Sequence, residues 1–345
     1  MNSRRTAPIK VALAGAGMIS WYHLTAWRKL GDRVRMLAVC EPDPERGSRR
    51  AAEFDIARVY RTAEELFAGE KIDALDIASP RESHVAWIDE AAAHGVDVLC
   101  QKPLAPTLAE AEAVIGRATG RVRVMAHENW RFRPWYRDLA EIVRSGELGD
   151  VLQAVMRMHS SEFLADANGR RPGLERQPFM ARETRLMIAE VLIHHLDVVR
   201  FLCGPLRVIE ARTLHTDADV VGETAATILL EMAGGRSVVV TGTITAPGFP
   251  SRTKDRLEIV GSKASAVLDA EELSVLGPAA RTIHYELDAA YQASFDGAIS
   301  HFAQCLESGA PFETDAADNL HTLRLVEDAY SAAAVARSAA GAART

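Results

Sequence analysis

The sequence predicts a doubly wound α/β domain with a parallel sheet, followed by an α+β domain with a large, mostly antiparallel open sheet. In the first third, short apolar runs alternate with helix-like segments, a pattern typical of parallel sheets covered on both faces. In the second half, strand-like segments follow one another with few helices between them, which favours antiparallel pairing. The length of 345 residues also fits two domains of roughly 150 residues each.

The first domain is expected to begin with a strand at 9–15, which stops at Gly15, and a helix over 19–30. Alternation continues with strands at 34–40, 73–78, 96–100 and 122–126, and with helices at 45–54, 83–94 and 107–118. We therefore divide the chain into domains 1–126 and 127–345.

The second domain is expected to contain strands at 151–159, 208–215, 224–232, 236–245, 256–260, 265–268 and 282–287. A helix at 186–202 and two C-terminal helices, at 291–308 and 316–338, are expected to cover one face of the sheet. The open face predicts a homodimer or homotetramer, because a large sheet with apolar residues on both faces often lies in a subunit interface.

Composition excludes several classes of protein. With 48% hydrophobic and 25% charged residues the chain is typical of soluble globular proteins, and a net charge of −7 argues against a nucleic-acid partner. The apolar runs are far shorter than the ~20 residues that span a membrane. Because no signal-peptide pattern opens the chain, we expect a cytoplasmic location. The four cysteines have no spacing typical of a disulfide framework or zinc site.

Residues 15–20, Gly-Ala-Gly-Met-Ile-Ser, form a G-x-G-x-x-G fingerprint whose third glycine is a serine. The fingerprint follows a predicted strand and opens a predicted helix, the context in which it binds a dinucleotide. Gly15 would permit the tight turn, and Gly17 would let the backbone approach a pyrophosphate at the helix N-terminus, beside Met18 and Ile19. The first domain is therefore predicted to be of the Rossmann type.

Glu41 ends the second predicted strand. A carboxylate at this position binds ribose hydroxyls and repels a 2′-phosphate, so the sequence favours NAD over NADP. Arg46, Arg49 and Arg50 follow closely and leave some tolerance of NADP open.

Four segments carry a resemblance to a known family: Ile77 to Pro80 followed by His84, Val98 to Leu104 with Gln101-Lys102-Pro103, Asn129 to Pro134, and Glu190 to Gly204. With them, residues 9 to 335 resemble the Gfo/Idh/MocA oxidoreductases, which include glucose-fructose oxidoreductase and inositol dehydrogenases. Gln101 and Glu190 replace the family's usual Glu and Asp, and Leu192 replaces a Gly.

The resemblance implies that Lys102, His194 and Glu190 carry the chemistry, with His194 as the catalytic histidine. We expect further cofactor contacts from Ser79, Pro80, His84, Gln101 and Lys102. The expected substrate-binding residues are Trp130, Arg131, His195 and Asp197, with Arg133 close by, since an aromatic face packs against a sugar ring.

The residues themselves favour the same chemistry. Under α-helical spacing Glu190, His194 and Asp197 share one face, whereas His195 lies about 100° away and is expected to support domain packing. A neutral imidazole suits the uptake of a hydroxyl proton. Two alternatives stay open for this face: a salt-bridged surface, because Arg200 is three residues beyond Asp197, and a metal site, although the H-E-x-x-H signature is absent and we predict no metal.

The segment 164–185 contains five arginines, Arg170, Arg171, Arg176, Arg182 and Arg185. They are candidates to clamp a substrate carboxylate or phosphate; the alternative is a solvated run of charge.

Together these features predict an NAD-dependent dehydrogenase that transfers hydride between nicotinamide and a secondary carbinol of a sugar, polyol or cyclitol, with a sugar acid as a further candidate. The active site is expected to need both halves of the chain, Lys102 from the first and His194 from the second. Two alternatives are a non-catalytic NAD-bound regulator or sensor, and a lyase or hydrolase that uses NAD transiently.

Overall fold

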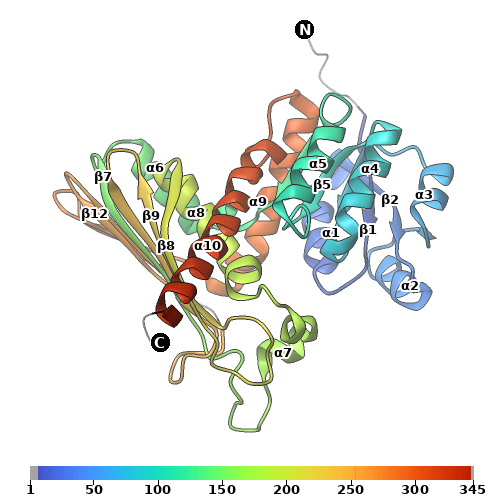
Figure 1. Ribbon diagram of the computed structural model, residues 1–345. Helices are drawn as coiled ribbons and strands as arrows, with labels where there is room; N and C mark the ends of the chain where they lie inside the picture. The colour runs from blue at the N-terminus through green and yellow to red at the C-terminus, as the bar shows by residue number, and fades with distance from the viewer. Residues whose placement is uncertain (1–6, 253, 343–345) are drawn as a thin grey trace. The chain divides into compact units, whose positions relative to one another are not determined.

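The computed structural model describes residues 7–252 and 254–342, and the chain folds into two compact units (Figure 1). Unit 1 comprises Met1–Phe132 and Tyr291–Leu323, and unit 2 comprises Arg133–Ala290 and Arg324–Thr345. Each unit therefore includes part of the C-terminal helices. The predicted division at residue 126 had assigned these helices to the second domain alone.

Unit 1 contains a six-stranded sheet in the order β3-β2-β1-β4-β5-β6, with all strand pairs parallel. Its strands are β1 (Ile9–Ala14), β2 (Val34–Cys40), β3 (Arg58–Tyr60), β4 (Ala74–Ile77), β5 (Asp97–Gln101) and β6 (Val124–His127). The helices between them are α1 (Ser20–Lys29), α2 (Pro44–Glu53), α3 (Ala63–Gly69), α4 (His84–His94) and α5 (Leu108–Ala118). The predicted doubly wound fold is confirmed, and only the short β3 and α3 were missed. The strand order reverses between β1 and β4, the place where such sheets bind ligands.

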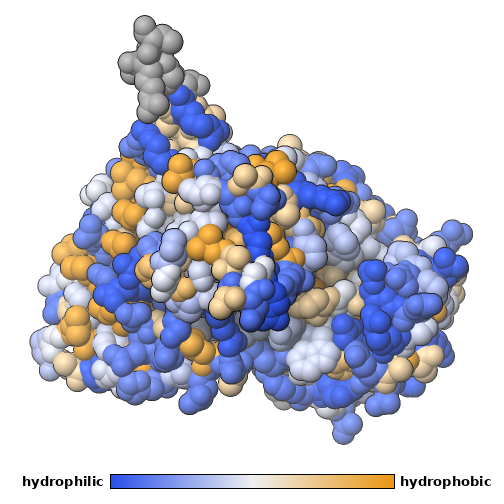
Figure 2. All heavy atoms as spheres, turned by 90° about the horizontal axis from the view of Figure 1, so that it is seen from below, coloured by the Kyte–Doolittle hydropathy of each residue, from blue (hydrophilic) through white to orange (hydrophobic). Residues whose placement is uncertain are grey.

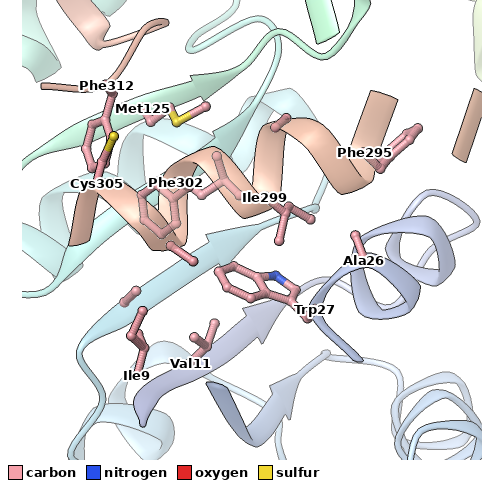
Figure 3. Packing of buried hydrophobic residues seen from close by; sticks show 14 of the residues in the cluster. Ile9, Val11, Ala26, Trp27, Met125, Phe295, Ile299, Phe302, Cys305 and Phe312 are labelled. Atoms are coloured by element: carbon pink, nitrogen blue, oxygen red, sulfur yellow. The ribbon is translucent and has the colours of Figure 1, made fainter. Parts of the chain in front are cut away.

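Helix α9 (Leu287–Ser308) packs in unit 1 rather than on the second sheet. Figure 3 shows its buried face, with Phe295, Ile299 and Phe302, against Trp27 of α1 and the start of β1. The expectation that both C-terminal helices cover the second sheet is therefore wrong for α9, because helical periodicity identifies an apolar face but not its partner.

Unit 2 contains an eight-stranded sheet in the order β14-β13-β12-β11-β7-β10-β9-β8. Its strands are β7 (Val151–His159), β8 (Leu206–Leu214), β9 (Ala225–Met232), β10 (Arg236–Thr243), β11 (Lys254–Gly261), β12 (Ser265–Asp269), β13 (Glu272–Leu276) and β14 (Arg281–His284). All pairs are antiparallel except β7 with β10. This confirms the predicted mostly antiparallel sheet, in which β13 was missed.

The helices of unit 2 are α6 (Pro134–Arg144), α7 (Pro172–Arg176), a π-helix (Met187–Leu192), α8 (Ile193–Cys203) and the second part of α10 (Ala316–Ala342). Helix α8 and the π-helix pack against the central strands β7 and β10. Ala154, Met156 and Met158 of β7 are buried on one side of the sheet, whereas the alternate residues of β7 remain half-exposed. One face of the sheet is therefore covered within unit 2 and the other is open.

No helix among the described residues is long and apolar enough to cross a membrane. On the face of the molecule drawn in Figure 2, hydrophobic residues form small separate patches among hydrophilic ones.

Candidate active site

The glycine turn after β1 is fixed by a close approach to the end of β4. Gly15 has φ +96°, and a Cβ there would lie 2.7 Å from the Cα of Ser79. A Cβ on Gly17, in contrast, would meet no protein atom within 4 Å. The turn therefore leaves clear space at Gly17, beside the N-terminal amides of α1, which have no partner within the helix. This observation fits the predicted contact between the backbone and a dinucleotide pyrophosphate.

Two side chains complete this turn. The buried Ser20 hydroxyl donates to the Gly17 carbonyl at 2.6 Å, so serine replaces the third glycine without leaving a buried polar group unsatisfied. The buried Glu41 carboxylate accepts from the Ala16 amide at 2.8 Å and lies 3.7 Å from the Arg46 guanidinium. Glu41 thus stands beside the glycine turn, where the sequence placed a ribose-binding carboxylate.

A buried polar chain leads to Lys102 at the end of β5. The Asp76 carboxylate contacts His23 Nδ1 at 2.9 Å and accepts from Trp27 Nε1 at 2.6 Å. The Gln101 Nε2 amide then lies 2.8 Å from His23 Nε2 and 3.1 Å from His127 Nδ1. The Gln101 Oε1 oxygen accepts the Lys102 backbone N–H at 3.2 Å.

These contacts determine the protonation of both histidines. The Lys102 N–H can only donate, so the Gln101 atom facing it is the oxygen, and the amide NH₂ faces the two imidazoles. The facing nitrogens, His23 Nε2 and His127 Nδ1, must then accept. His23 then has Nδ1 as the donor toward Asp76 and Nε2 as the acceptor toward Gln101. The Gln101 side chain therefore fixes the Lys102 backbone N–H and links it to both imidazoles.

His84 holds the two loops that flank this region. It is 1% exposed, and its Nδ1 and Nε2 lie 2.8 Å and 3.0 Å from the carbonyls of Pro103 and Ser79. Burial lowers the pKa of His84, whereas the two carbonyl acceptors oppose this shift. Its contacts assign it to supporting these loops; direct contact with cofactor remains a prediction for the more exposed Ser79 and Pro80.

The helix predicted at 186–202 begins as a π-helix, Met187–Leu192, and continues as α8. In an α-helix four residues exceed one turn by about 40°. A π-turn holds more residues than an α-turn, so it reduces the angle about the helix axis between the side chains of Glu190 and His194. The two predicted catalytic residues of this helix are therefore aligned more closely than α-helical spacing would give. Single π-turns occur frequently at functional sites.

Asp197 and His195, the other predicted site residues of this helix, contact charged partners. Asp197 is fully buried and pairs with Arg200 at 3.4 Å; the alternative predicted this pair, but on a surface rather than in the interior. His195 is 1% exposed, and its Nε2 lies 2.9 Å from Asp255. His194 is 8% exposed and Glu190 is partly exposed, which makes these two better candidates for contact with substrate than His195 or Asp197.

Asp255, at the start of β11, lies at the centre of a buried cluster of polar side chains. It accepts from Arg133 Nη1 at 3.0 Å and from the Tyr136 hydroxyl at 2.8 Å, in addition to His195. Burial alone would raise the pKa of Asp255, but His195, Arg133 and Tyr136 together hold it well below its usual range. The cluster joins β11, α6 and α8, so the packing role expected of His195 lies within unit 2.

Arg131 also has partners within its own unit. It is 2% exposed, and its guanidinium donates to the Asp318 carboxylate at 3.1 Å and to the Glu313 carbonyl at 3.3 Å. Trp130 remains partly exposed and packs edge-on against Tyr291 of α9. Of the predicted substrate-binding pair, Trp130 is thus the better placed.

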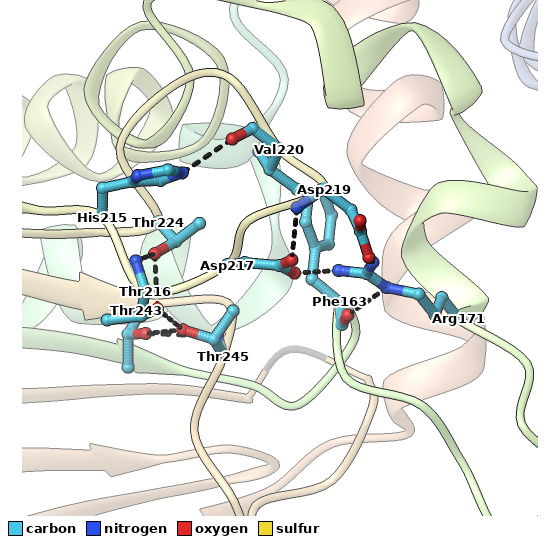
Figure 4. A network of polar contacts seen from close by, with 10 residues as sticks. All are labelled: Phe163, Arg171, His215, Thr216, Asp217, Asp219, Val220, Thr224, Thr243 and Thr245. Atoms are coloured by element: carbon cyan, nitrogen blue, oxygen red, sulfur yellow. Dashed lines mark hydrogen bonds and ion pairs between the residues drawn. The ribbon is translucent and has the colours of Figure 1, made fainter.

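Most of the arginine-rich segment is neutralised. Arg171 donates to the Phe163 carbonyl and pairs with Asp217 and Asp219 (Figure 4). Arg170, Arg176 and Arg185 pair with Asp166, Glu162 and Glu327, respectively. These contacts favour a structural role for four of the five arginines over an anion clamp.

Sequence reasoning missed Asp76, His23 and His127, and also Glu223 and Tyr330, which contact the start of the π-helix. A signal existed for Asp76, because a carboxylate in the otherwise apolar strand Ala74–Ile77 requires a buried partner. The contacts of Glu223 and Tyr330 are remote in sequence and left no local signal.

Comparison with known proteins identifies the family. The oxidoreductase model described as an NAD-binding Rossmann fold matches residues 9–128, and the GFO/IDH/MocA C-terminal domain matches residues 136–267. The chain belongs to the Gfo/Idh/MocA oxidoreductase family. The predicted resemblance, the oxidoreductase class and NAD as the cofactor are thereby confirmed.

Members of this family resemble the chain over nearly its full length. A D-apiose dehydrogenase from Paraburkholderia graminis is 31% identical over 95% of this chain and 88% of its own. An inositol 2-dehydrogenase from Acidothermus cellulolyticus is 29% identical over 87% of this chain and 85% of its own. Among solved structures, an oxidoreductase from Agrobacterium radiobacter in complex with NAD+, L-tartaric acid and magnesium has a TM-score of 0.88 at 30% identity, covering 95% of this chain and 97% of that one.

Proposed function

We propose that this family member is an NAD-dependent dehydrogenase that oxidises a secondary carbinol of a sugar, polyol or cyclitol, or reduces the matching ketone. The observation that carries the proposal is the similarity, over nearly the full length of both chains, to a D-apiose dehydrogenase. The similarity to an inositol 2-dehydrogenase supports the same chemical class.

Residues of unit 1 would hold the cofactor. Gly15 and Gly17 shape the turn, the amides of Met18 and Ile19 would bind the pyrophosphate, and Glu41 would bind the ribose. Ser79 and Pro80 would contact the cofactor from the adjoining loop. Bound NAD supplies the hydride acceptor for oxidation of the carbinol.

Residues of the protein would transfer the hydroxyl proton and bind the reacting oxygen. The Lys102 ammonium donates a hydrogen bond to the carbinol oxygen and stabilises the negative charge that develops there. His194 takes the hydroxyl proton as general base and returns it in the reverse direction. Glu190 orients the imidazole, and Trp130 presents an aromatic face to the sugar ring.

Two substitutions test these roles. Lys102→Ala and His194→Ala should each lower turnover at least about a hundredfold, while NAD still binds. His284→Ala, at an exposed histidine on β14, provides a matched control and should retain full activity. Near-normal turnover in both site variants would refute the mechanism. The alternatives separate in the same assay, because a sensor gives no turnover and a lyase or hydrolase consumes substrate without accumulating NADH.

We also infer that the open face of the second sheet joins two copies of the chain in a homodimer or a homotetramer. Leu229, Val239, Val155 and Val267 lie in one row across β9, β10, β7 and β12, interrupted only by Glu258 of β11. These side chains are half-buried in the single chain. Light scattering should give a dimeric or tetrameric mass, and Val239→Lys should reduce it; a monomer at micromolar concentration would contradict the inference.

A further inference from the structure

The π-helix Met187–Leu192 begins with a complete set of hydrogen-bond acceptors supplied from distant parts of unit 2. The Glu223 carboxylate accepts from the amides of Leu186 at 3.3 Å and Ile188 at 3.1 Å, and the Glu223 carbonyl accepts from Met187 at 3.2 Å. The fourth amide, that of Ala189, donates to the Tyr330 hydroxyl at 3.3 Å. Helix N-termini normally leave such amides to local caps or water, so this clamp is specific to the segment.

Glycine allows Glu223 to reach the helix. A Cβ on Gly222 would lie 2.5 Å from the Glu183 carbonyl and 2.7 Å from the Leu186 Cβ. Gly222 therefore permits the backbone before β9 to touch the residues that precede the π-helix. The negative charge of Glu223 also interacts favourably with the positive end of the helix dipole.

Tyr330 of α10 is itself held in place. Its hydroxyl donates to Glu223 at 2.5 Å, and the Arg185 guanidinium lies 4.2 Å from its ring centre. Arg185 also pairs with Glu327, one turn earlier on α10, at 2.9 Å. Burial, and then the Glu223 carboxylate, raise the pKa of Tyr330, so the hydroxyl stays protonated and continues to donate.

The opposite side of the π-helix is seated on the sheet through a second glycine. A Cβ on Gly242 of β10 would lie 2.6 Å from the Met187 side chain and 3.0 Å from that of Leu192. The π-turn is thus fixed at its N-terminus by hydrogen bonds and along its side by close packing. A π-turn is a rare conformation, and these contacts explain why it persists here.

We propose that Glu223 and Tyr330 are positioning residues, which hold the π-turn and thereby set the orientation of Glu190 relative to His194. The inference rests on the proposed roles of those two residues. Without the clamp the segment can relax toward α-helical hydrogen bonding, which rotates Glu190 away from the imidazole that it orients. Neither positioning residue needs to touch the substrate for this effect.

The test compares Tyr330→Phe and Glu223→Gln with Tyr285→Phe, which removes a similar hydroxyl–carboxylate bond, to Asp138 at 2.7 Å. The two clamp variants should lower kcat by about tenfold to a hundredfold, with KM and NAD affinity nearly unchanged, whereas Tyr285→Phe should retain wild-type kcat. The double variant should lose no more activity than the worse single variant, because the two groups act as one unit.

Hydrogen exchange of the amides at 186–189 provides a readout that does not depend on activity. Exchange at these amides should accelerate in both clamp variants while the strands of the same unit keep their protection. Unchanged exchange would refute the clamp, and faster exchange with unchanged kcat would refute its positioning role. If instead Lys102→Ala and His194→Ala keep normal turnover, the proposed function itself fails, whatever the exchange shows.

Discussion

Gln101→Glu tests the protonation scheme deduced for the chain of side chains behind Lys102. In the wild-type protein the Gln101 amide donates to His23 Nε2 at 2.8 Å and to His127 Nδ1 at 3.1 Å. The ionised carboxylate of the variant would donate nothing, so each imidazole nitrogen would face a carboxylate oxygen. The mismatched contact at His23, whose Nδ1 proton is held by Asp76, costs about 1–3 kcal/mol. His127 can carry its proton on Nδ1 instead, so unit 1 is expected to lose about 1–3 kcal/mol at pH 8.

Acidification should recover part of this loss. A proton taken up by either imidazole, or by the introduced carboxylate itself, restores one donor, so the folded variant binds a proton that the unfolded chain releases. The pKa of that group is then higher in the folded state, and its stabilising effect is lost as the pH rises. Over the 1.5 units from pH 6.5 to pH 8 the difference from wild type should grow by about 2 kcal/mol.

Urea unfolding at pH 6.5 and at pH 8 measures this difference. Gln101→Met is the matched control, because it removes the same donors without adding a titratable group and its destabilisation should not depend on pH. A Gln101→Glu variant whose loss of stability is equal at the two pH values would refute the assignment of His23 Nε2 as a hydrogen-bond acceptor.

Three further predictions concern the cofactor site and the second unit. Gly15→Ala places a Cβ 2.7 Å from Ser79 at φ +96° and should lower both the Tm and the affinity for NAD. In Gly17→Ala the new Cβ meets no protein atom within 4 Å, so calorimetry should show a lower affinity for NAD while the Tm stays unchanged. Glu41→Ala should narrow the preference for NAD over NADP, and an unchanged ratio of kcat/KM values would contradict its role at the ribose. Asp255→Asn removes the charge that neutralises a buried cluster and should lower the free energy of unfolding by about 3–5 kcal/mol. Asp269→Asn, at an exposed ion pair, should lower it by less than about 1 kcal/mol. Equal losses would show that the buried cluster contributes no more to stability than the exposed pair.

The parts of the fold that local sequence patterns specify were predictable. The alternation of apolar runs and helices identified the parallel sheet, and the spacing of Gly15 and Gly17 after an apolar strand located the tight turn between β1 and α1. The ion pair of Asp197 and Arg200 likewise follows from helical spacing.

Features that depend on remote partners were not predictable. The π-turn depends on Glu223, 37 residues from Leu186 in the chain, and nothing near residue 187 indicates it. His195 was expected among the substrate-binding residues, yet its neighbour across the fold is Asp255, 60 residues away. Arg131 likewise pairs with Asp318. In each case the polar residue has a partner that is remote in sequence, and its contact with a ligand stays a prediction.

The most direct measurement of the central claim is NADH formation, followed at 340 nm, with D-apiose, inositol and L-tartaric acid as substrates. We predict that NAD and at least one sugar, polyol or cyclitol give sustained NADH formation, and that Lys102→Ala and His194→Ala abolish it. No NADH from any of these compounds, with NAD bound to the protein, would contradict the claim that the chain is a dehydrogenase of this substrate class.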